Sequence, residues 1–274
     1  MKFSIQNFTT ILLFALLLAL AACSGSPPPV TPTSVPTASP SPTVVPTISP
    51  TLTVTIPSSP LYQLVTLSYW VKNDGRITAR VPALTGSLDP RVIKFNHEMS
   101  ALVDEVIRLG TSDWGGKHAP VDANLPESFL DVRFELVSPP DNIFSLKFEI
   151  TSYAKGAAHP FDYSRTATYD LEKGEDVTLD QLFLPGSDYL GTISAYCIAK
   201  LSASEIGPVF SIEGAQPDAK NYRNWNITAD GLLITFDEYH VAPYAAGPQT
   251  VVVPYSALRT IIDPQGPLAV FLSK

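Results

Sequence analysis

The stretch Phe144-Ser145-Leu146-Lys147-Phe148-Glu149-Ile150-Thr151 decides the fold, because apolar and polar residues alternate along it without a break. A period of two places the two sets of side chains on opposite faces of a β-strand. Residues 130–136 repeat the alternation, and Pro139-Pro140-Asp141-Asn142, which lies between the two segments, is typical of a turn. We therefore predict two antiparallel strands with one face toward a core and the other toward water.

A helix is predicted before these strands. Asp89-Pro90 is typical of an N-cap followed by proline at the first helical position, and Gly110 is predicted to end the helix. Further toward the N-terminus, Asn73-Asp74-Gly75 separates residues 61–71 from residues 76–81 and predicts a hairpin. Apolar residues recur along one face of the predicted helix: Val92, Phe95, Met99, Leu102 and Val106. This face is expected to cover the sheet.

The second half of the chain continues the mixture of strands and helices. Residues 163–171 and 177–183 read as strands on either side of the turn 172–175, and Ser187 is a candidate N-cap for a second helix. Strands are also predicted around Trp225, at 232–236 and at 250–254. The helix is expected to bury Leu190, Ile193, Cys197 and Leu201 on one face. The predicted fold class is α+β, with antiparallel sheets, one or two covering helices, and two halves, 61–184 and 185–274.

The N-terminus carries an export signal that ends in a lipobox, Leu20-Ala21-Ala22-Cys23. Lys2 precedes a short apolar run, and small residues precede Cys23, as in a cleaved secretory signal. The run is shorter than the roughly 20 apolar residues that span a bilayer. Residues 1–22 are thus predicted to be the signal peptide of a bacterial lipoprotein, in which Cys23 becomes the first residue and carries diacylglycerol and palmitate-type chains.

The alternative for this segment is an uncleaved N-terminal anchor. Both readings place the rest of the chain outside the cytoplasm, at the outer face of the bacterial cell membrane. The membrane is thus the first predicted partner, held through the lipid on Cys23.

Residues 23–60 are predicted to form a disordered linker after the lipidated cysteine. Residues 24–60 hold eleven prolines, sixteen serines or threonines and no charged residue. Such a composition buries too little apolar surface to offset the entropy of ordering. The linker is either a passive spacer or an O-glycosylated stalk.

The charge and the cysteine content exclude several classes of protein. The formal net charge is −8, and a protein that binds nucleic acid needs a basic face, so no nucleic-acid partner is expected. An acidic surface suits a cationic partner, or simply solubility. Lipidation at Cys23 would leave Cys197 without a disulfide partner. Cys197 is predicted to be a buried, unreactive thiol.

Several ordered motifs in residues 61–274 resemble a known pair of domains of unknown function. This pair is found outside the membrane in the anti-sigma factor RsiV and at the N-terminus of the peptidoglycan deacetylase PdaC. The motifs are Val81-Pro82-Ala83-Leu84-Thr85-Gly86, Tyr153-Ala154-Lys155-Gly156-Ala157-Ala158-His159-Pro160, Tyr169-Asp170-Leu171-Glu172-Lys173-Gly174-Glu175, Leu179-Asp180-Gln181-Leu182-Phe183, Tyr239-His240-Val241-Ala242-Pro243-Tyr244-Ala245-Ala246-Gly247 and Val253-Pro254-Tyr255-Ser256. The first half is expected to be PdaC-like and the second RsiV-like.

The resemblance implies a binding role rather than the activities of the two relatives. The RsiV ectodomain is a lysozyme receptor, but lipidation at Cys23 would leave no cytoplasmic anti-sigma segment. PdaC carries its chemistry in a separate deacetylase domain, so we do not expect deacetylation here. The resemblance therefore implies a module that binds a protein or glycan of the cell wall.

One group of residues invites a catalytic interpretation: Tyr153, His159, Asp162, Glu238 and His240. The sequence lacks HExxH, CxxC and GxSxG patterns, so no catalytic residue, metal ligand or cofactor is assigned. His159 follows Gly156-Ala157-Ala158 and precedes proline. We expect it to organise this loop, with partner contact and metal or acid–base work as alternatives.

Tyr239, Pro243 and Tyr244 are the other ligand-binding candidates, beside His159. They follow the predicted strand 232–236, and aromatic residues on loops often anchor ligands. The alternative is that both tyrosines pack under the loop. The favoured function is a membrane-tethered, non-catalytic binding or sensing lipoprotein, with lysozyme or another cell-wall-related protein or glycan as ligand. The alternatives are a cell-envelope enzyme or accessory acting on peptidoglycan, and a structural envelope protein.

Overall fold

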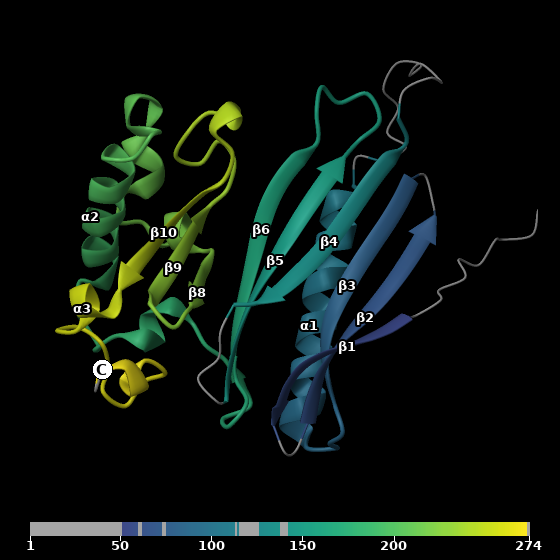
Figure 1. The fold of residues 1–274 in the computed structure, drawn as a ribbon, viewed down its shortest axis with the longest axis horizontal. Helices are drawn as coiled ribbons and strands as arrows, with labels where there is room; N and C mark the ends of the chain where they lie inside the picture. The colour runs from purple at the N-terminus through teal and green to yellow at the C-terminus, as the bar shows by residue number, and fades with distance from the viewer. Residues whose placement is uncertain are drawn as a thin grey trace, which may run out of the picture. The chain divides into compact units, whose positions relative to one another are not determined.

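Seven strands form one sheet in the order β1-β2-β3-β4-β5-β6-β7 in the computed structural model (Figure 1). The structure describes residues 51–59, 62–72, 75–112, 114, 126–137 and 142–272. The strands are β1 (Thr51–Ser59), β2 (Tyr62–Lys72), β3 (Gly75–Thr85), β4 (Ser128–Leu136), β5 (Ile143–Tyr153), β6 (Phe161–Asp170) and β7 (Glu175–Asp176). The predicted hairpins β2–β3 and β4–β5 are confirmed, and the α+β class with them.

The pair β3–β4 is parallel, whereas the sequence analysis expected antiparallel sheets. The connection between the two strands contains helix α1 (Pro90–Gly110), which carries the chain back along the sheet before β4 begins. A crossover of this kind is what a parallel pair requires. All the other neighbouring strands of this sheet are antiparallel.

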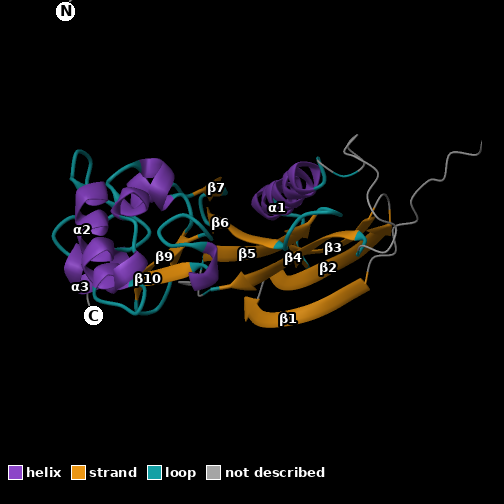
Figure 2. Ribbon diagram, turned by 90° about the horizontal axis from the view of Figure 1, so that it is seen from above, coloured by secondary structure: helices purple, strands orange, loops and turns teal. Residues whose placement is uncertain are grey.

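Helix α1 begins and ends where the sequence predicts. The Asp89 side chain accepts a hydrogen bond from the backbone N–H of Arg91 at 2.9 Å, and Pro90 occupies the first turn. Figure 2 shows α1 lying against one face of the sheet. The Phe95 ring lies 5.4 Å from that of Phe144 and 5.3 Å from that of Tyr169. The buried face comprises Val92, Phe95, Met99, Val103 and Val106.

Strand β1 lies inside the segment 23–60 that the sequence analysis predicts to be a linker. It pairs with β2 at the edge of the sheet, and its register shifts between Val54 and Ser58. Pro57 lies in this irregular stretch, as expected for proline in an edge strand. The predicted signal peptide, Cys23 and linker residues 24–50 lie outside the described residues.

A second sheet has the order β10-β9-β8 and is antiparallel throughout. Its strands are β8 (Trp225–Ile227), β9 (Gly231–Phe236) and β10 (Gln249–Pro254). Helices α2 (Tyr189–Ser202) and α3 (Tyr255–Leu258) pack against β10. Ile193, Cys197 and Leu201 are buried, as predicted, whereas Leu190 is only partly buried because it lies in the first turn of α2 at the margin of the core. Burial raises the pKa of the Cys197 thiol to about 12.

The two sheets meet through polar side chains on the face of β5 that was predicted to meet water. That prediction is wrong at Ser145, which is fully buried. Its hydroxyl oxygen accepts hydrogen bonds from the Asn226 side chain at 3.0 Å and the Ile227 backbone N–H at 2.9 Å. It also lies 3.2 Å from the Thr168 hydroxyl. Strand β8 therefore occupies a place that the alternation assigns to solvent.

Two local predictions in the connection to α2 are wrong. Residues 177–183 do not form a strand, because Leu179–Leu182 is a 3-10 helix with a capping box made by Thr178 and Gln181. The N-cap of α2 is Asp188 rather than Ser187, and its carboxylate accepts the Gly191 N–H at 3.0 Å. A carboxylate at this position satisfies an N–H of the first turn.

In the described part of the chain, no helix combines the length and apolar character that a membrane crossing needs.

Candidate functional site

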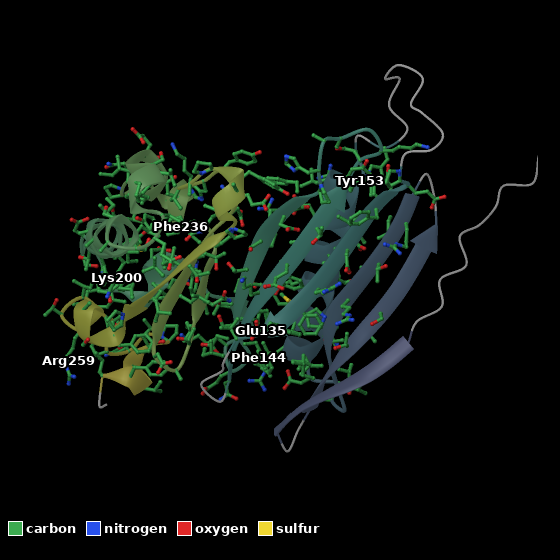
Figure 3. The ribbon with its side chains drawn as sticks, turned by 45° about the horizontal axis from the view of Figure 1, so that its top comes forward. Glu135, Phe144, Tyr153, Lys200, Phe236 and Arg259 are labelled. Carbon is green, nitrogen blue, oxygen red and sulfur yellow. The ribbon has the colours of Figure 1, made fainter. Side chains whose placement is uncertain are left out.

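Two loops that are far apart in the sequence meet at the candidate site. One connects β5 to β6 at residues 154–160, and the other connects β9 to β10 at residues 237–248. Tyr153 and Phe236, labelled in Figure 3, are the last residues before these loops. The Tyr244 hydroxyl of the second loop donates a hydrogen bond to the Pro160 carbonyl of the first, at 3.3 Å.

Three of the four predicted binding residues form a stack of rings. The ring centroids of His159 and Tyr244 are 3.9 Å apart, with an angle of 31° between the planes. Those of Tyr239 and Tyr244 are 5.7 Å apart, at 29°. Tyr244 thus links one ring from each loop, and the structure brings these candidates together.

The His159 ring is also held by a hydrogen bond. Its Nδ1 lies 2.7 Å from the Pro160 carbonyl oxygen, so Nδ1 must carry the proton. The neutral ring then presents Nε2 as an acceptor. His159 therefore has the loop-organising contacts expected of it, while its second nitrogen stays available to a ligand.

Tyr239 combines exposure with an unusual backbone conformation. Its φ is 62°, the only positive value for a non-glycine residue in the described chain, and its side chain is 59% exposed. An aromatic residue in the left-handed region is strained, and such strain clusters at functional sites. Tyr244 is half-buried, whereas Tyr239 faces solvent.

Pro243 shapes the loop beside the stack. It is exposed and immediately precedes the 3-10 helix Tyr244–Ala246, and its carbonyl accepts the Ala246 N–H at 2.9 Å. Its fixed φ favours this turn and so positions Tyr244.

Two buried carboxylates fasten the second loop to the open edge of β6. Asp237 accepts the Ser164 backbone N–H at 2.8 Å, and Glu238 accepts that of Asp162 at 3.3 Å. Asp237 also accepts the Arg223 guanidinium and the Asn224 amide, both at 3.1 Å. These acids therefore have a structural task, because they satisfy N–H groups of a strand edge.

His240 belongs to the same polar layer. Its Nε2 lies 3.2 Å from the Asn221 side-chain oxygen, and its ring meets that of Phe236 edge-on. Burial, and then the nearby Arg223, lower the pKa of His240, while Asp237 acts in the opposite direction. His240 is thus held as a neutral, structural histidine near neutral pH.

Of the five residues that invited a catalytic interpretation, His159, Glu238 and His240 line one cleft, but each of them has a structural contact. Tyr153 is buried and stacks on Phe129 at 5.7 Å. Glu238 binds a backbone N–H and His240 binds an amide oxygen. Within the described ranges, no three or more His, Cys, Asp or Glu residues are arranged to hold a metal ion.

A cleft of about 770 Å³ opens beside the stack. Its walls come from α1, from the β5–β6 loop with His159, from the start of β6 and from the loop after β9. Burial raises the pKa of Tyr163, which lines the cleft. Phe161, Tyr163 and Arg165 were not predicted as site residues, because alternation along a strand is typical of ordinary packing. Their only signal is two aromatics and an arginine on one face, in a strand whose opposite face is polar.

The C-terminal half matches a family of proteins without an assigned function. Residues 180–256 match the family described as "Protein of unknown function (DUF3298)", so the chain contains a DUF3298 domain. A crystal structure of a DUF3298 family member from Bacteroides fragilis shares the fold, with a TM-score of 0.55. The match covers 84% of this chain and 99% of that one, at 12% identity.

Several curated proteins show distant sequence similarity to this chain. The immunogenic protein MPT64 of Mycobacterium tuberculosis is 25% identical over 53% of this chain and 62% of its own length. The peptidoglycan-N-acetylmuramic acid deacetylase PdaC of Bacillus subtilis is 26% identical over 50% of this chain and 30% of its own. Esterase Rv3036c of M. tuberculosis is 28% identical over 38% and 45%. The chain thus spans less than two thirds of each of these relatives.

Proposed function

We propose that this chain is a lipid-anchored, extracytoplasmic binding protein without catalytic activity, and that His159, Tyr239 and Tyr244 form its ligand contact. The observation that carries the proposal is the ring stack, which ends in a solvent-facing tyrosine held at positive φ. Exposed aromatic rings on a fixed backbone are effective anchors, because little conformational entropy is lost on binding. The lipobox at Cys23 supports attachment to the outer face of the cell membrane.

The proposed ligand is a cationic protein that acts on the cell wall, with lysozyme as the representative. The formal net charge of −8 favours such a partner through electrostatic steering. The resemblance of residues 61–274 to a lysozyme-receptor ectodomain points the same way.

The test is a calorimetric titration of the purified full-length chain, in detergent, with lysozyme. We expect measurable binding that weakens as salt is added. Tyr239→Asn removes the ring while asparagine tolerates the left-handed conformation, so the loop should persist. This variant should bind at least about tenfold more weakly. Leu88→Asn, at an 89% exposed position before α1, is the matched control and should bind normally. No heat at low salt, or equal weakening in both variants, would refute the proposal.

A cell-envelope enzyme is the second candidate, favoured by the similarity to the deacetylase PdaC and to an esterase. The free Nε2 of His159 is the group that such chemistry would use. Mass spectrometry of muropeptides incubated with the wild-type chain and with His159→Ala decides between the binding protein and the enzyme. Products that depend on His159 would replace the binding proposal with this one.

A further inference from the structure

A groove continues from the cleft along helix α1. The cleft of about 770 Å³ adjoins a second hollow of about 570 Å³, and both are lined by Leu102, Glu105 and Arg223. On α1 the lining residues run from His97 to Gly110. At 1.5 Å per residue, this stretch is about 20 Å long. The groove therefore has room for an extended ligand.

Phe161, Tyr163 and Arg165 share the face of β6 that looks into this groove. They stand opposite Ser152, Ile150 and Phe148 in the register of the β5–β6 pair. Phe148 and Ile150 are buried in the core under α1, whereas their neighbours on β6 are only partly covered. Phe161 is 41% exposed. The start of β6 thus extends beyond the cover that α1 gives to β5.

The three side chains form an aromatic platform with one cation above it. The rings of Phe161 and Tyr163 stack with centroids 5.8 Å apart and an angle of 25°. The Arg165 guanidinium carbon lies 5.8 Å from the centre of the Tyr163 ring. None of the ion pairs among the described residues includes Arg165, whereas Arg223 is paired with Asp237. Arg165 is therefore the cation that this groove offers to a ligand.

The edge of β6 disfavours one class of extended ligand, a peptide that pairs with the sheet as an additional strand. A peptide that added to the sheet as a strand would need the backbone N–H groups of this edge. Those of Asp162 and Ser164 already donate to Glu238 and Asp237. A glycan does not need these backbone N–H groups, since its sugar faces pack on aromatic rings and its hydroxyls form hydrogen bonds with charged side chains. Glu105 and Glu238 line the groove and supply acceptors.

We propose that this groove binds an extended, acidic glycan whose sugars lie on Phe161 and Tyr163 and whose carboxylate pairs with Arg165. The guanidinium fork matches a carboxylate and forms charge-assisted hydrogen bonds to both oxygens. The site goes beyond the proposed function, because the platform lies on β6 and its ligand is a carbohydrate rather than a cationic protein. His159 of the proposed ligand contact lines the same cleft, whereas Tyr239 and Tyr244 do not.

The test compares two tetrasaccharides that differ in charge. One alternates N-acetylglucosamine with N-acetylmuramic acid whose lactyl carboxylates are free, and the other is chitotetraose, which has no carboxylate. Titrated into the purified full-length chain, the acidic sugar should bind at least about tenfold more tightly. Equal affinity for the two sugars, or no binding of either at millimolar concentration, would overturn the proposal.

Variants assign the preference to the groove. Arg165→Gln should lose the preference for the acidic sugar and bind chitotetraose as the wild type does, and Arg165→Lys should keep part of the preference. Phe161→Ser should weaken the binding of both sugars. Arg76→Gln is the matched control, because Arg76 lies on β3 outside the groove. Its guanidinium carbon also lies 5.8 Å from a ring centre, that of Phe129 on β4. Preference that survives Arg165→Gln in a variant with wild-type thermal unfolding would contradict the site.

Two further outcomes separate this site from other proposals. A free wall peptide that binds as tightly as the acidic sugar would replace the glycan with a peptide ligand. Tyr239→Asn should leave sugar binding unchanged, since Tyr239 does not line the groove. Absence of lysozyme binding by the wild-type chain, together with intact sugar binding, would therefore refute only the proposed function.

Discussion

The β5–β6 pair is covered on both faces, but the two covers are built from different chemistry. Toward α1 the contacts are rings, since Phe95 packs on Phe144 and Tyr169. Toward β8 they are hydrogen bonds of 2.9 to 3.2 Å among Ser145, its neighbours on β8 and Thr168. We call the contact with α1 the apolar interface and the contact with β8 the polar interface.

The difference separates stability from positioning. Apolar contact is non-directional, so the apolar interface contributes through the area it removes from water. Hydrogen bonds are directional, and a buried donor that loses its acceptor is costly. The polar interface therefore fixes where β8 and the following loop lie. Asp237 and Glu238, which fasten that loop to β6, extend the same layer to the candidate site.

The largest effect is expected from breaking the apolar interface. Phe95→Ala removes a fully buried ring and leaves a cavity between α1 and the sheet, which should cost about 3–5 kcal/mol of unfolding free energy. Ile93→Ala, at a 54% exposed position on the same helix, should change it by less than about 0.5 kcal/mol. Denaturant unfolding of both variants gives the comparison. Similar costs at the two positions would mean that α1 does not bury the face described.

A smaller effect is expected from the polar interface. Ser145→Ala takes away the acceptor of two buried donors, the Asn226 amide and the Ile227 N–H, and should cost about 1–3 kcal/mol. A double-mutant cycle with Asn226→Ala should show that the two changes are coupled, because they remove one interaction. Additive costs in denaturant unfolding would contradict the contact.

The apolar interface could be predicted from the sequence, and the polar interface could not. The helical spacing of Val92, Phe95 and Met99 and the alternation in β5 each define a buried face without reference to any partner. Ser145 gives the opposite impression, because a small polar residue in an alternating strand is expected to face water. Only the fold shows that Asn226 and Ile227, more than 80 residues later, supply the hydrogen bonds that permit its burial.

The same reasoning explains the smaller differences. Residues 51–55 alternate threonine with leucine or valine, but the surrounding prolines give the segment the composition of a linker. The apolar residues Leu179 and Leu182 suggest a strand, whereas the Thr178–Gln181 capping box determines a 3-10 helix. In both cases a short pattern indicated the observed structure, but the composition of the surrounding residues favoured another structure.

The candidate site was predictable in its residues but not in its geometry. Aromatic residues on loops drew attention to Tyr239 and Tyr244, and the motif ending in His159-Pro160 drew attention to the first loop. Their stacking depends on the meeting of two loops about 80 residues apart, which follows from the sheet contacts. The platform on β6 had no local signal, since exposure of one strand face depends on how far α1 reaches.

The smallest effect, a dependence on pH, is expected from His240, which lies in the polar layer that extends the polar interface to the candidate site. Burial, the main cause, lowers the pKa of His240 from its ordinary value of 6.5, so the unfolded chain takes up a proton there before the folded chain does. The stabilisation associated with the neutral ring is therefore complete above pH 6.5 and is lost as pH falls through 6.5 toward the folded pKa. His240→Gln keeps a donor for the Asn221 oxygen but does not titrate. When the pH is lowered from 7.5 to 5, the wild type should therefore lose unfolding free energy relative to this variant. The difference between wild type and Phe95→Ala should stay constant over this range, and a constant difference for His240→Gln would show that the ring carries the same charge in both states.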